Sequence, residues 1–88
     1  MLRFYYYTDE WGNWALVKAA DENEAWGLLI GFFDYEPRGY DVRVLDRMEA
    51  LAMLGRLEVP CYTRFEEVWE ARWQFESGQS GVIFGEAG

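Results

Sequence analysis

The stretch LRFYYYTDEWGNWALVKA, at residues 2–19, predicts a β-hairpin. Residues 2–8 alternate in polarity and are rich in aromatic residues that favour strands, and residues 14–19 alternate again. Residues 9–13, DEWGN, lie between them and carry the Gly and Asn that are typical of a turn. Two such runs joined by a short loop containing Gly indicate a pair of antiparallel strands.

The rings of the first strand must divide between its two faces, because side chains alternate along a strand. Leu2, Phe4 and Tyr6 share one face, and we expect this set to lie in the core because it carries the least polar residues. Tyr5 and Tyr7 share the other face, which either is covered by a second layer or remains an outer face lined by tyrosine. Tyrosine tolerates such exposure because its hydroxyl can stay hydrated, so both residues are candidates for binding a partner.

Trp11 lies in the predicted turn beside Asp9 and Glu10, where strand parity does not place it. An exposed tryptophan flanked by acids is a plausible binding hot spot. The alternative is that Trp11 folds back over the hairpin. All three residues are therefore candidates for contact with a partner.

Three potential capping boxes mark where helices begin. In this pattern, an Asp or Thr accepts a hydrogen bond from the backbone three residues later, and the Glu there bonds back. The pairs are Asp21/Glu24, Asp46/Glu49 and Thr63/Glu66. They predict helices that end near residues 33, 55 and 75.

The elements follow the order ββαβαα with a final β. Residues 34–39 are expected to form a loop, residues 40–45 a third strand and residues 82–84 a short last strand. This order predicts one α+β domain over residues 1–88, with three helices on a mainly antiparallel sheet of three to four strands.

The composition limits the partners that the chain can bind. Sixteen acids against eight bases give a net charge of −8, which disfavours binding to DNA, RNA or an anionic membrane. The same charge suits a basic protein surface. Cys61 is the single cysteine, and the N-terminus lacks the apolar run of a signal peptide, so we expect a cytoplasmic protein without a disulfide.

The residues that most catalysis needs are missing. The chain has no His, one Cys, and neither a P-loop nor a G-x-G-x-x-G motif. The predicted capping boxes already give the paired acids a structural role. We therefore expect no enzymatic activity and no catalytic, cofactor-binding or metal site.

The first predicted helix carries no charge from residue 25 to residue 33. Gly27 and Gly31 lie within it and cost about 1 kcal/mol each relative to Ala, so we expect another segment to approach their backbone closely. Either this helix is held between the sheet and the third helix, or it forms the interface of a homodimer or a groove for a partner.

The third helix divides into two arcs when its residues are placed at steps of about 100°. Its apolar arc, which we expect to face the core, also contains Arg72 between two tryptophans; its members are Phe65, Val68, Trp69, Arg72, Trp73 and Phe75. The opposite arc holds Glu66, Glu67, Glu70 and Gln74 without an offsetting base. This arc is either a solvated face or an anionic ridge that binds a basic partner.

Small size, high negative charge and missing catalytic residues give the chain a profile that resembles the small anti-defence proteins encoded by phages, including anti-CRISPR inhibitors. The resemblance is one of overall type. It implies an inhibitor that mimics nucleic-acid charge and blocks a basic, nucleic-acid-binding protein such as a CRISPR effector nuclease or its surveillance complex, in the host cytoplasm. The alternative is a self-associating structural or regulatory module, joined through the first helix or through an exposed edge of the hairpin.

Overall fold

The computed structural model describes residues 1–34, 40–56 and 65–86. It contains a four-stranded antiparallel sheet and three helices in the order ββαβααβ, so the predicted α+β class is confirmed. The elements are β1 (Arg3–Asp9), β2 (Trp14–Ala19), α1 (Glu22–Phe33), β3 (Tyr40–Leu45), α2 (Arg47–Arg56), α3 (Phe65–Glu76) and β4 (Gly81–Glu86).

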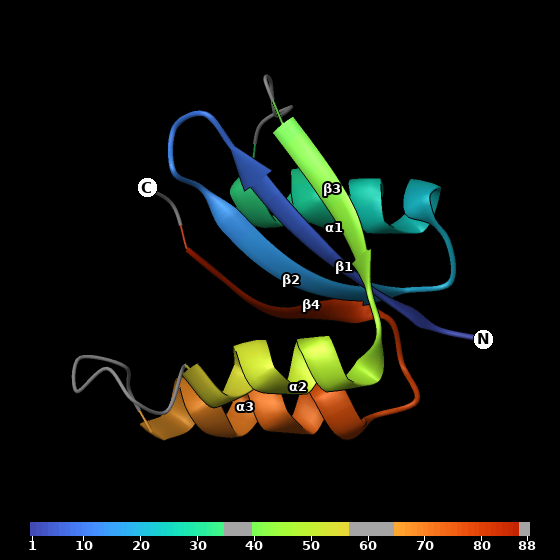
Figure 1. Cartoon of the computed structure of the whole chain (residues 1–88), viewed down its shortest axis with the longest axis vertical. Helices are drawn as coiled ribbons and strands as arrows, with labels where there is room; N and C mark the ends of the chain where they lie inside the picture. Colours follow the sequence, from blue (N-terminus) through green and yellow to red (C-terminus); the bar gives the residue numbers. More distant parts are fainter. Residues whose placement is uncertain (35–39, 57–64, 87–88) are drawn as a thin grey trace.

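The strands lie in the order β3-β1-β2-β4, so the hairpin strands β1 and β2 form the centre of the sheet. Helix α1 covers one face, and α2 and α3 cover the other (Figure 1). The chain crosses one face through α1 to reach β3, and then crosses the other face through α2 and α3 to reach the opposite edge at β4. The result is a three-layer structure with an apolar cluster on each side of the sheet.

The two apolar clusters follow from the alternation of side chains along the central strands. On the α1 side, Tyr7 is fully buried and its ring lies 5.5 Å from that of Phe33. On the other side, Phe4 stacks on Phe75 of α3 with ring centroids 5.0 Å apart. Both faces of the hairpin are therefore buried, which explains why its strands carry so many rings.

The first two predicted capping boxes are confirmed. The Asp21 carboxylate accepts a hydrogen bond from the Glu24 N–H at 2.8 Å, and Glu24 accepts one from the Ala20 N–H at 2.8 Å. At α2, the Asp46 carboxylate accepts from the Glu49 N–H at 2.8 Å, and Glu49 accepts from the N–H of Asp46 itself at 3.1 Å, whereas Glu24 bonds to the residue before its cap. The third box begins at Thr63 and, with Cys61, lies outside the described residues.

The prediction that Tyr5 and Tyr7 offer an outer face is wrong. They are only 4% and 0% exposed, because α1 forms the second layer that was the other alternative. The face expected to be the core is also covered, but less completely: Phe4 is buried, whereas Leu2 and Tyr6 are half-buried. Tyr5 and Tyr7 thus contribute to the core rather than to a binding surface.

Two expectations about exposed or covered segments are also corrected. The hairpin has no exposed edge, because β3 pairs with β1 and β4 pairs with β2. Helix α1 is not held between the sheet and α3, because those two helices lie on opposite faces (Figure 1). A Cβ added at Gly27 or Gly31 would meet no atom within 4 Å, so none of the segments that the structure describes approaches these glycines closely.

Helix α3 is rotated relative to the sequence prediction. Ala71 and Phe75 are its buried residues in the described part, whereas Trp69 and Trp73 are 64% and 57% exposed. Arg72 is exposed as well. The two tryptophans predicted to lie in the core therefore face solvent.

Candidate partner-binding surface

The hairpin turn is organised by the Asp9 carboxylate. Its Oδ1 accepts hydrogen bonds from the backbone N–H groups of Trp11 at 2.9 Å and Asn13 at 3.0 Å. Its Oδ2 accepts one from the Asn13 side-chain amide and one from the Tyr7 hydroxyl, both at 2.8 Å. The Asp9 carboxylate is thus occupied within the fold, because it accepts four hydrogen bonds from residues in and next to the turn.

Two opposing effects set the pKa of Asp9. Desolvation acts to raise it, but the hydrogen bonds from Asn13, Tyr7 and Trp11 outweigh desolvation, and the pKa falls below its ordinary value. The carboxylate therefore stays ionised as part of the turn. Glu10 and Trp11, the other predicted residues of this region, are exposed, and Trp11 is 60% exposed.

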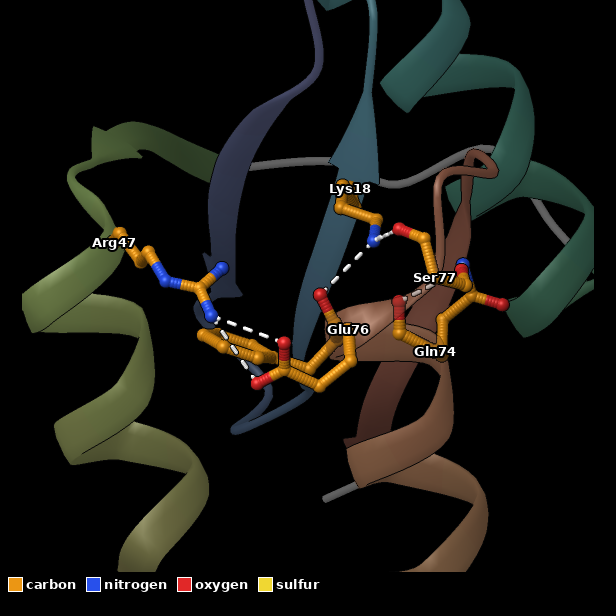
Figure 2. Close-up of polar contacts among 6 residues, drawn as sticks. Lys18, Arg47, Gln74, Glu76 and Ser77 are labelled. Carbon is orange, nitrogen blue, oxygen red and sulfur yellow. Dashed lines mark hydrogen bonds and ion pairs between the residues drawn. The ribbon is translucent and has the colours of Figure 1, made fainter.

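A buried lysine fixes the end of α3. The Lys18 ammonium reaches from β2, is 4% exposed as a residue, and donates to the backbone carbonyls of Phe75, at 3.0 Å, and Ser77 (Figure 2). The Phe75 carbonyl belongs to the last turn of α3 and Ser77 follows directly after the helix, so the ammonium lies at the C-terminal end, where a cation is favourable. Burial lowers the pKa of Lys18, against the raising effect of the Glu76 carboxylate, and Arg47 adds to the lowering.

Arg47 and Phe75 join α2 to the same end of α3. The Arg47 guanidinium donates to both carboxylate oxygens of Glu76 at 3.1 Å, and it lies 4.8 Å from the centroid of the Phe75 ring (Figure 2). The Arg47–Glu76 ion pair is exposed, so its own contribution to stability is small. Together with Lys18, these contacts set which side of α3 faces the core.

The outward side of α3 carries a surface that we call the tryptophan face, made of Trp69, Glu70 and Trp73. The two rings stand four residues apart on adjacent turns, so they lie on the same side of the helix. Beside them is a shallow depression lined by Trp69, Arg72, Trp73, Glu76 and Ser77. Glu70 is exposed and, within the described part of the chain, forms no hydrogen bond or ion pair.

The predicted anionic ridge is only partly described. Glu70 lies beside Trp73 at the surface, so acid and aromatic groups share one side of α3 instead of occupying opposite arcs. The side chains of Glu66 and Glu67 lie outside the described residues. Glu70, one of the predicted binding residues, thus lies next to exposed tryptophan rings. These rings had been expected in the core.

An open groove of about 530 Å³ adjoins the tryptophan face along β4. One wall is Phe32 of α1 and the other comes from α3; the lining residues are Phe32, Glu70, Trp73, Gln74 and residues 82–85. Phe32 lies against the strand because Gly85 has no side chain: an added Cβ there would lie 2.8 Å from the Phe32 ring. We call this site the β4 groove.

A bulge shapes the strand that lines the groove. Leu16 pairs with Phe84 and Val17 with Val82, so Ile83 is the additional residue on β4. Ile83 is buried and Phe84 packs against the same cluster, on the α2 and α3 side. The groove was not predicted from the sequence, although the uncharged run from Gly81 to Gly85 is the signal that could have indicated it.

Other kinds of site are not seen in the described residues. No three Cys, Asp or Glu side chains among them gather as metal ligands would, and no helix there has the length and apolar character to cross a membrane. Comparison with protein-family models, curated proteins and solved structures finds no match to the chain. Function must therefore be inferred from the tryptophan face and the β4 groove.

Proposed function

We propose that this protein is a small acidic binding module that docks on a basic, nucleic-acid-binding protein and inhibits it. The observation that carries the proposal is the exposure of Trp69 and Trp73 on α3 beside Glu70. Tryptophan is the residue type most enriched among binding hot spots, and a folded domain gains stability by burying it. Two adjacent rings left in solvent therefore suggest a surface that is covered in a complex.

The charge of the chain supports the choice of a basic partner. A net charge of −8 on 88 residues steers the module toward positive surfaces and keeps it away from nucleic acid itself. A surface that binds phosphate groups is a natural target, because carboxylates compete there for the same Lys and Arg side chains. Such competition would make the module an inhibitor of anti-CRISPR type, acting in the cytoplasm.

The test is affinity capture from a lysate of the native host, with a variant that lacks both rings. The wild type should capture a basic, nucleic-acid-binding protein, which added DNA or RNA oligonucleotides and raised salt should release. Trp69→Ala combined with Trp73→Ala should reduce capture about tenfold or more, as expected for hot-spot residues.

Val44→Ala is the matched control, because Val44 is an apolar residue of β3 that is also exposed. This variant should capture as much partner as the wild type. Equal capture by the double tryptophan variant, or a captured protein that oligonucleotides do not displace, would contradict the proposal.

Self-association is the second candidate function, and the position of β4 at an edge of the sheet favours it. Two copies could pair β4 with β4, since an edge strand is a ready template for another strand. Light scattering at micromolar concentration separates the two candidates. A protein that stays strictly monomeric would exclude the self-associating module. A stable dimer that still binds the partner as well as the monomer does would show that the two functions use different surfaces.

A further inference from the structure

We propose that the β4 groove binds an extended, basic peptide segment of the partner, added to the sheet as a strand beside β4. The inference rests on the proposed function, since Trp73 and Glu70 border both the tryptophan face and the groove. It names the form and charge of the bound segment, which the proposed function leaves open.

The first support is the unpaired edge. In the described part of the chain, β4 is hydrogen-bonded to one strand, β2, and the order β3-β1-β2-β4 places it at the end of the sheet. An edge strand presents N–H and C=O groups that a peptide can pair with, as in binding by strand addition.

The second support is the absence of charged side chains along most of this edge. The opposite edge strand, β3, carries Asp41 and Arg43, and charged side chains are a common means of preventing edge pairing. Residues 81–85 of β4 carry no charge, and the first acid is Glu86 at its end. Of the two edges, only β4 lacks charges along most of its length.

The third support is the shape of the site. Phe32 and Trp73 rise from the two helix layers on either side of β4 and are 45% and 57% exposed. Side chains of an added strand alternate between its two faces, so successive residues would meet Phe32 on one side and Trp73 on the other. Both walls offer aromatic surface to an extended segment.

The charge of the lining identifies the segment as basic. Glu70 is the only charged residue among the described residues that line the groove, and Glu86 follows at the end of the strand. An Arg or Lys of the segment could pair with Glu70 and stack on Trp73. A second copy of this chain suits the groove less well, because it would bring another net charge of −8 to the site.

The experiment is a titration of the isotope-labelled protein, followed by amide NMR. The probe is a synthetic peptide of about eight alternating Arg and Val residues, long enough to cover the six residues of β4. Binding should shift the amide signals of β4 and slow their hydrogen exchange, with little change in β3. A peptide of the same charge with Pro in place of Val should not do so, because Pro cannot donate the hydrogen bonds of a strand.

Two pairs of variants sharpen the result. Glu70→Gln should weaken peptide binding about threefold to fivefold, the size of one exposed ion pair, and Trp73→Ala about tenfold. Asp41→Asn and Val44→Ala, the matched changes on β3, should leave the affinity within about twofold of the wild type.

The outcomes separate this inference from the proposed function. If the peptide leaves β4 unchanged, or the Pro peptide binds equally well, the strand-addition inference is wrong, even where Trp69 and Trp73 are needed for partner capture. If the β4 signals shift with protein concentration alone, the occupant is a second copy and the inference is again wrong. If the proposed function itself is wrong, the double substitution of Trp69 and Trp73 will leave partner capture unchanged.

Discussion

The hairpin turn and the outward side of α3 each combine exposed tryptophan with acidic residues, yet they use the acids differently. At the turn, the Asp9 carboxylate accepts four hydrogen bonds from the residues around it. On α3, Glu70 forms no such contact with the described residues and stands beside Trp73. The fold thus uses the Asp9 carboxylate to hold the turn, whereas it leaves the Glu70 carboxylate at the surface beside Trp73.

Each of the two regions depends on one charged anchor, which allows them to be disrupted separately. Asp9 holds the turn, and Lys18 holds the end of α3 through the carbonyls of Phe75 and Ser77. Substitutions at Lys18, Asp9 and Trp11 test whether the two regions differ in this way.

The largest effect is expected from Lys18→Met. This change keeps an apolar chain of similar length but leaves the Phe75 and Ser77 carbonyls without their donor, at a cost of about 2–3 kcal/mol in the free energy of unfolding. Urea denaturation followed by tryptophan fluorescence measures it. Because α3 would lose its fixed orientation, peptide binding at the β4 groove should weaken as well. A loss below about 1 kcal/mol would show that Lys18 is not the anchor.

A smaller loss, about 1–2 kcal/mol, is expected from Asp9→Ala, because several partly exposed hydrogen bonds disappear together. Urea denaturation measures this loss, and partner capture should be unchanged.

The contribution of Asp9 to stability should also depend on pH. Since its folded pKa is lowered, the stabilisation is fully present above the ordinary value near 3.8 and is lost as pH falls through the folded pKa. The stability difference between the wild type and the variant should therefore shrink below about pH 4. A difference that stays constant in acid would contradict this account of the turn.

The smallest effects are expected from Trp11→Ala. Trp11 is 60% exposed, so the melting temperature should change by no more than a few degrees. Trp11→Ala should weaken partner capture less than Trp73→Ala does, because Asp9, one of the two acids beside Trp11, is occupied within the turn. If Trp11→Ala abolished capture and Trp73→Ala did not, the turn rather than α3 would be the binding surface.

The sequence predicted the helices and strands well because their signals are local. The hairpin, the boxes at Asp21 and Asp46, and the last strand depend on residues within a few positions of one another. Of the predicted binding residues, Glu70, Glu10 and Trp11 are exposed, whereas Tyr5 and Tyr7 are buried. The error at Tyr5 and Tyr7 arose because strand parity separates two faces without telling which elements will cover them.

The order of the elements and the acidic charge could be read from the chain alone, since periodicity, caps and composition depend on residues close in sequence. The packing of the fold was needed to learn that α1 covers one face of the sheet, that α3 turns Trp69 and Trp73 to solvent, and that β4 lies at an edge. The physical reason is that the orientation of α3 depends on partners distant in sequence. Lys18 lies 57 residues before Phe75, and Phe4, which stacks on that ring, comes from the first strand.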